Sequence, residues 1–130
     1  MNTLPTYDTV RDETEAAIKR IADEFPPGTR AVPRPEQSPY GCSGEGVMYT
    51  GHWDIYPSPG FDAARFIDDL PDKLGDGFVV DDLGVDTNFP LVSLVADAYG
   101  GAGIDVSAGS IDGADFVDII AMSQCAQPPE

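Results

Sequence analysis

The chain has 130 residues, with 23 acidic and seven basic side chains, and its formal net charge at pH 7 is −16. This length is typical of one domain with a single core. The charge is concentrated in residues 74–130, which carry ten acids and neither lysine nor arginine. Such a field repels nucleic acids and anionic lipid surfaces, so we expect no nucleic-acid partner, whereas a cation or a basic protein is attracted. Adaptation to high salt or an acidic proteome explains the same charge without a partner.

The sequence predicts no transmembrane segment, because no apolar run reaches the ~20 residues that a spanning helix needs. It also lacks a basic segment followed by an apolar stretch at its start, as a secretory signal would have. Two interpretations follow: a cytoplasmic protein, or the mature part of an exported protein whose signal has been removed.

Residues 6–25 are predicted to form the first helix, with Thr6 or Asp8 as the N-terminal cap. Pro26 and Pro27 end it, because proline cannot continue a helix. The apolar stripe expected to face the core has helical spacing and consists of Val10, Thr14, Ala17, Ile18, Ile21 and Phe25.

The sheet is expected to begin near Val47, after an extended connection over residues 29–46 that contains three prolines. The alternating pattern places Trp53 and Ile55 on one side of this strand, and His52 and Asp54 on the other. A second helix follows, capped by Ser58 and ended or bent by Pro71. Its predicted buried stripe is Phe61, Ala64, Ile67 and Leu70.

Four more strands are expected, and their turns are marked by glycines such as those of Gly100–Gly103 and Asp112-Gly113. The predicted fold is a single α+β domain over residues 1–130, in which both helices pack on one face of a largely antiparallel sheet of about five strands. Residues 1–5 and 126–130 are expected to be loose tails. The four strands are predicted at residues 78–83, 90–99, 103–108 and 116–124.

Cys42 and Cys125 are the only cysteines, and they flank the predicted sheet. They are expected to form a disulfide, since antiparallel pairing of the first and last strands would bring them together. Two buried free thiols are the alternative. A metal site at the cysteines is not expected, because the chain has one histidine and no Cys-x-x-Cys pair. The disulfide favours the exported interpretation.

The order of elements and the cysteine placement resemble those of small cell-envelope lipoproteins of actinobacteria, with the LppA-type family of mycobacteria nearest. The resemblance rests on the helix end at Pro27-Gly28, the irregular stretch with Cys42, the second helix at 61–67, the glycines Gly75 and Gly77, and the close at Cys125. It implies an exported or lipid-tethered envelope protein without assigned chemistry. The lipid-modified N-terminal cysteine of that family has no counterpart in this sequence.

No catalytic residue is predicted. His52 is the single histidine, and with Asp54 two residues away it has the pattern of a general base oriented by a carboxylate. An exposed strand histidine explains the same residues. The serines lack the Gly-x-Ser-x-Gly context of a nucleophile elbow, and no phosphate-binding loop is present, so no cofactor is expected.

The acidic segment from Asp105 to Asp118 is the remaining candidate for a cation site. Oxygen ligands for calcium could come from Asp105, Asp112, Asp115 and Asp118, but their spacing does not match the EF-hand pattern. A solvated acidic hairpin is the preferred interpretation, and no metal site is predicted.

Two function classes fit the sequence. The first is a non-catalytic envelope protein that acts by binding a small ligand or a protein. The alternative is an acidic immunity or inhibitor protein that covers a basic toxin or nuclease.

Overall fold

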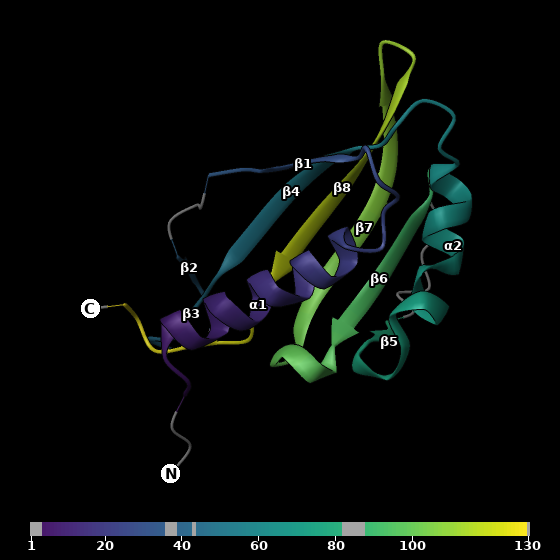
Figure 1. The fold of residues 1–130 in the computed structure, drawn as a ribbon. Coiled ribbons are helices and arrows are strands. Elements are labelled where there is room, and N and C mark those ends of the chain that lie inside the picture. The colour runs from purple at the N-terminus through teal and green to yellow at the C-terminus, as the bar shows by residue number, and fades with distance from the viewer. Residues whose placement is uncertain (1–3, 36–38, 43, 82–87, 130) are drawn as a thin grey trace.

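The computed structural model describes residues 4–35, 39–42, 44–81 and 88–129, which form an antiparallel sheet with both helices on one face (Figure 1). The main sheet has six strands in the order β1-β4-β8-β7-β6-β5, and β2 and β3 pair separately. This confirms the predicted α+β class. The elements are α1 (Tyr7–Ala22), β1 (Arg30–Pro33), β2 (Tyr40–Gly41), β3 (Val47–Met48), β4 (Thr50–Tyr56), α2 (Ala63–Leu74), η1 (Gly75–Gly77), β5 (Val79–Val80), β6 (Leu91–Ala96), η2 (Asp97–Tyr99), β7 (Ala102–Ile111) and β8 (Ala114–Met122).

Helix α1 follows its predicted pattern closely. Thr6 is the N-cap, and its hydroxyl accepts a hydrogen bond from the Thr9 N–H. All six members of the predicted stripe, from Val10 to Phe25, are buried. The helix ends at Ala22, three residues before the predicted end.

Helix α2 differs from its prediction in its cap and in one buried position. Asp62, not Ser58, is the N-cap, and its carboxylate accepts from the Arg65 N–H. Ala64 is exposed, and Ala63 is buried in its place. Pro71 lies inside the helix, which continues to Leu74. Within the described residues, neither helix is long and apolar enough to cross a membrane.

The stretch at 29–46 is not simply a connection, as the sequence suggests, because it contributes β1 and β2. Strand β1 forms the edge of the main sheet, where it pairs with β4 alone. Pro33 is tolerated there because an edge strand has one side without a ladder. Because of its prolines, this stretch is predicted to be a connection, and its residues show no strand periodicity.

The strands after α2 occur in the predicted order but with different bounds. Strand β5 is short, and residues 82 and 83 of the predicted strand lie outside the described residues. Strand β7 is longer than predicted, because its pairing with β8 continues to a tight turn. Asp112 and Gly113 form this turn with φ angles of 52° and 80°, as expected of a two-residue hairpin loop.

The core lies between the two helices and the sheet. Alternate residues of the central strands face it, and Val117, Ile119 and Ala121 of β8 have no exposed surface. Burying a valine or isoleucine side chain stabilises the fold by about 1.5–3 kcal/mol. Helix α1 packs closely on β4 at Gly51, where a Cβ atom would lie 2.8 Å from Cδ1 of Ile18. A glycine at this position therefore allows the helix to reach the sheet.

Part of the expected C-terminal tail belongs to the fold. Ala126 is fully buried, and it pairs with Val47 through hydrogen bonds in both directions. The Gln127 N–H donates to the Pro5 carbonyl, so the two ends of the described chain lie together (Figure 1). The prediction of loose tails is therefore wrong for these residues, while residues 1–3 and 130 lie outside the described part.

A disulfide joins Cys42 and Cys125, as predicted, with their Cα atoms 6.2 Å apart. Cys42 follows β2, and Cys125 lies three residues beyond the end of β8. The bond therefore ties the small β2–β3 sheet to the C-terminal end of the main sheet. Disulfides are typical of oxidising compartments outside the cytoplasm.

Reduction of this disulfide is expected to lower the free energy of unfolding by up to about 4–5 kcal/mol, the chain-entropy value for a loop of about 84 residues. Urea denaturation with and without a reductant measures the change. The double variant Cys42→Ser/Cys125→Ser serves as the control and should not respond to the reductant. Two thiols that react with iodoacetamide in unfolded, non-reduced protein would contradict the bond.

Candidate functional site

The face of the sheet turned away from the helices, here called the open face, carries the candidate site. Side chains alternate along β8, so Val117 and Ile119 face the core while Asp118, Ile120 and Met122 face the other way. Ile120 and Met122 are 43% and 50% exposed. The open face is therefore accessible to solvent at its centre.

The pairing of β4 with β8 brings acids from distant parts of the sequence together on this face. The register places Asp54 directly opposite Asp118, and His52 opposite Ile120. Alternation along β4 puts His52 and Asp54 on the same side, as the sequence predicts. Asp118 joins them from 64 residues away in the chain, and sequence spacing does not indicate this contact.

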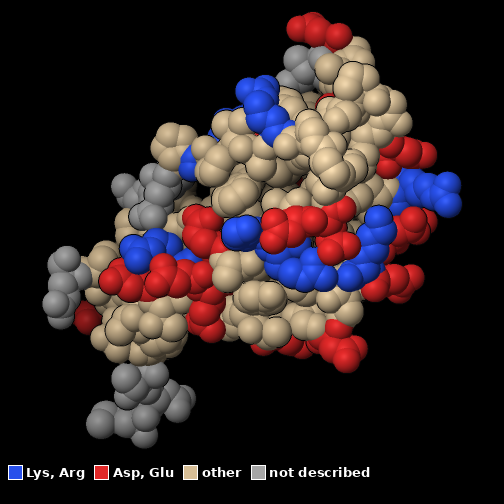
Figure 2. Space-filling model, viewed as in Figure 1, with Lys and Arg blue, Asp and Glu red and all other residues tan. Residues whose placement is uncertain are grey.

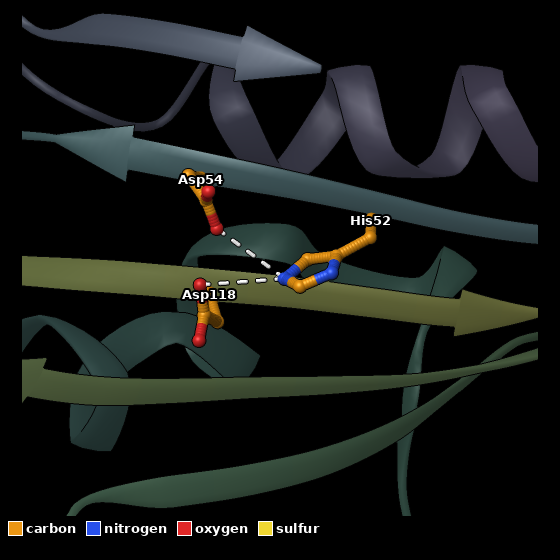
Figure 3. A group of neighbouring side chains, drawn as sticks. All are labelled: His52, Asp54 and Asp118. Carbon is orange, nitrogen blue, oxygen red and sulfur yellow. Dashed lines mark hydrogen bonds and ion pairs between the residues drawn. The ribbon is translucent and has the colours of Figure 1, made fainter. Parts of the chain in front are cut away.

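His52 lies between the two carboxylates (Figure 3). Its Nε2 is 3.3 Å from Asp54 Oδ1 and 3.4 Å from Asp118 Oδ1. A ring nitrogen carries at most one hydrogen, so Nε2 can donate to only one of these oxygens at a time. The histidine side chain is 33% exposed and contacts both acids, so it is a half-buried member of a polar group that still reaches solvent.

Asp54 is the most buried member of the group, with a side chain that is 9% exposed. Its Oδ2 accepts a hydrogen bond of 2.8 Å from Arg34 Nε. Its Oδ1 is buried and accepts no well-aligned hydrogen bond within the described part of the chain, although His52 Nε2 lies 3.3 Å away. A buried carboxylate oxygen without a partner is costly, so Asp54 has an unused capacity to bind a hydrogen-bond donor or a cation.

The surroundings move the pKa values of the two carboxyls in opposite directions. Hydrogen bonding with Asp118, followed by the hydrogen bond from Arg34, lowers the pKa of Asp54 below its ordinary value. Burial, followed by hydrogen bonding with Asp54, raises the pKa of Asp118. The pair therefore favours an ionised carboxyl at Asp54, while Asp118 keeps its proton to a higher pH than an ordinary aspartic acid does.

The calcium ligands considered along the hairpin do not come together. Asp105 accepts a hydrogen bond of 2.7 Å from Ser93 Oγ on β6. Asp112 lies in the turn, and Asp115 is exposed near it, opposite Ser110. Asp105 and Asp115 are thus separated by about five residues of strand, or about 17 Å. Of these four acids, Asp118 alone is grouped with another acid of the described residues, which is Asp54 of β4.

A hollow of about 340 Å³ adjoins the group on the open face. A larger hollow of about 830 Å³ lies between α2 and β6, but it does not include His52, Asp54 or Asp118. The smaller one contains both polar and apolar side chains and a histidine of the cluster. It is lined by Arg34, Pro35, Tyr40, Thr50, Gly51, His52, Ile120 and Met122.

Two parts of this site are absent from the sequence-based predictions. Arg34 lies just beyond β1, in the stretch predicted to be irregular, and its N–H donates to the His52 carbonyl. Tyr40 belongs to β2, which periodicity does not indicate. The one available signal is the shared phase of His52 and Asp54 in a strand.

Compared with protein-family models, curated proteins and solved structures, the chain shows no match.

Asp118→Asn is expected to raise the melting temperature at pH 7 by a few degrees. The pKa of Asp118 is higher in the folded than in the unfolded chain. The contribution of this carboxyl to the free energy of unfolding is therefore complete below its unfolded pKa of about 3.9, and it is lost as the pH rises through its folded pKa. The advantage of the variant should therefore disappear toward pH 3. Thermal unfolding monitored by circular dichroism, with a chelator present, measures the melting temperatures of the wild type and the variant at pH 7 and pH 3.

Asp115→Asn is the matched control, because it removes one acid from an exposed position of the same strand. If both variants shift the melting temperature equally at every pH, the effect comes from net charge alone and the prediction about Asp118 is wrong.

Proposed function

We propose that this protein is a non-catalytic binding protein of the cell envelope, which holds a small, largely apolar ligand in the hollow on the open face. One observation carries the proposal: large apolar side chains are exposed on this face beside a concave site. Tyr40, Ile120 and Met122 are between 43% and 50% exposed and line the hollow. Exposed apolar surface of this kind is characteristic of binding sites.

The polar wall of the hollow supports recognition of one polar group on the ligand. Arg34 and His52 lie beside the apolar side chains, and a few convergent polar groups in an apolar pocket fix a ligand's orientation. The remaining donors of the Arg34 guanidinium suit a carbonyl or carboxylate. A ligand with an apolar body and such a group at one end fits the lining.

The chemistry of the lining supports binding rather than catalysis. Among the described residues around the hollow, the hydroxyl groups belong to Thr50 and Tyr40, and no serine or cysteine is present. His52 directs Nε2 toward Asp54 and Asp118 (Figure 3). A nucleophilic mechanism needs the base within hydrogen-bond reach of its nucleophile, whereas the contacts of His52 among the described side chains are with Asp54 and Asp118.

An envelope location is supported by the disulfide, since such bonds persist in oxidising compartments. The alternative of an acidic inhibitor for a basic toxin gains less support. Figure 2 shows the face with the helices, where lysine and arginine side chains lie among the acidic ones. Ion pairs such as Arg20–Glu24 and Lys19–Asp23 account for part of this mixture. A broad, unbroken acidic surface is not present on that side.

Nile red, a neutral apolar dye, tests the hollow without repulsion from the net charge. We expect saturable fluorescence enhancement with the wild-type chain. Met122→Ser should weaken dye binding at least fivefold, because it removes an apolar wall of the hollow. Fluorescence titration of folded protein measures the dissociation constant.

Val79→Ser is the matched control. Val79 is 50% exposed, as is Met122, but it lies on β5 away from the hollow. Equal loss of dye binding in both variants, or no saturable binding by the wild type, would show that the hollow is not the binding site.

A further inference from the structure

We propose that His52, Asp54 and Asp118 form a binding site for a divalent transition-metal ion, with Zn²⁺ as its preferred occupant. The inference goes beyond the proposed function, because it does not depend on what fills the neighbouring hollow. Each residue offers one ligand atom, and the three atoms lie within 4.8 Å of one another. They come from two adjacent, hydrogen-bonded strands, which hold them on a rigid part of the fold.

The separations of the histidine nitrogen from the two carboxylate oxygens match the coordination geometry of zinc. Metal–ligand bonds of about 2.0–2.2 Å place neighbouring ligands of a tetrahedron about 3.3–3.6 Å apart. Nε2 of His52 lies 3.3 Å from Asp54 Oδ1 and 3.4 Å from Asp118 Oδ1. Both separations exceed the usual 2.7–3.2 Å of an N–H···O hydrogen bond. The arrangement is thus more open than a well-formed hydrogen-bonded triad, and it has the spacing of metal ligands.

A second observation that points to a cation is that one buried oxygen of Asp54 lacks a well-aligned hydrogen bond among the described residues. Asp54 Oδ1 is buried in a side chain that is only 9% exposed, and it accepts no well-aligned hydrogen bond from the described residues, with His52 Nε2 at 3.3 Å. The other oxygen is bound to Arg34. An outer partner of this kind orients a ligating carboxylate toward its metal. Arg34 thus acts as a positioning residue that leaves Oδ1 facing His52 (Figure 3).

Charge supports the same conclusion. Asp54 and Asp118 face each other directly across two strands, and like charges in this position destabilise a sheet. A divalent ion between them compensates both carboxylates, whereas one histidine proton serves only one at a time. The strongly acidic chain, with a net charge of −16, also raises the local concentration of cations.

The donor set selects among divalent ions. Calcium and magnesium prefer oxygen ligands alone, and calcium takes six to eight of them. An imidazole with two carboxylates suits zinc, which commonly uses three protein ligands and leaves a fourth position for water or another molecule. Because His52 also lines the hollow, that fourth position would be reached from the pocket side.

Zinc binding to the untagged, chelator-stripped chain tests the proposal, since a histidine tag would itself bind zinc. Isothermal titration calorimetry should show one zinc per chain. His52→Ala and Asp118→Asn should each weaken binding at least tenfold, and Asp115→Asn should leave it unchanged. His52 is the only histidine, so nitrogen NMR of its ring follows the site directly. Zinc should shift the signal of Nε2 far more than that of Nδ1.

Three results would overturn the proposal. They are the absence of one-to-one binding, equal affinity in His52→Ala and Asp115→Asn, and calcium or magnesium binding as tight as zinc binding. Melting curves of each variant without metal confirm that it is folded. Asp54→Asn provides a second test of the same site, because it preserves the shape of the side chain and removes the charge. If the wild-type chain binds zinc but does not bind Nile red, the result counts against the proposed apolar ligand in the hollow and not against the zinc site.

Discussion

The antiparallel pairing of β4 with β8 is the constraint on which the rest of the structure depends. These strands are second and third in the strand order of the main sheet, and their pairing joins the first half of the chain to its last strand. Their register puts Ile55 opposite Val117 on the core side and Asp54 opposite Asp118 on the open side. A shift by one residue would exchange the two faces, placing carboxylates in the core. Burial of the aliphatic residues therefore holds the acids together.

This register has an electrostatic cost that the surrounding residues partly offset. Arg34 binds one oxygen of Asp54, and His52 lies between the two carboxylates. The pKa of Asp54 is lowered by hydrogen bonding with Asp118 and Arg34, and that of Asp118 is raised by burial and by hydrogen bonding with Asp54, so the pair favours a single negative charge. Perturbed groups of this kind are concentrated at functional sites, although structural networks also contain them. Here the group adjoins a hollow with exposed apolar walls, which favours a functional role.

The sequence predicts the parts of this fold that have a strong period and a local signal. Helix α1, the Asp112-Gly113 turn and the alternation along β4 follow from residues that are close in the chain. Strand β1 cannot be predicted in this way, because an edge strand buries few side chains and Pro33 is unfavourable in most strands. In α2, the cap at Asp62 and burial of Ala63 depend on how the helix meets the sheet. Local spacing alone cannot resolve that contact.

The candidate site was less predictable than the fold because it requires long-range register. His52 and Asp54 share a phase that is visible in the sequence, but Asp118 is placed beside them only by sheet order and by the hairpin that fixes β8. The sequence groups Asp118 with Asp105 because they are near in the chain. The pleat instead turns both toward the open face, and Asp105 pairs with Ser93 while Asp118 meets β4.

The disulfide connects these two levels, because it braces the site as well as the fold. Tyr40 forms one wall of the hollow two residues before Cys42, and Met122 forms another three residues before Cys125. Strand β2 is otherwise held by a ladder of only two residue pairs with β3, and so short a pairing is marginal by itself. The covalent bond therefore keeps Tyr40 against the end of β8. The walls of the candidate site therefore depend on an oxidising environment more than the core does, since the core is held by apolar burial.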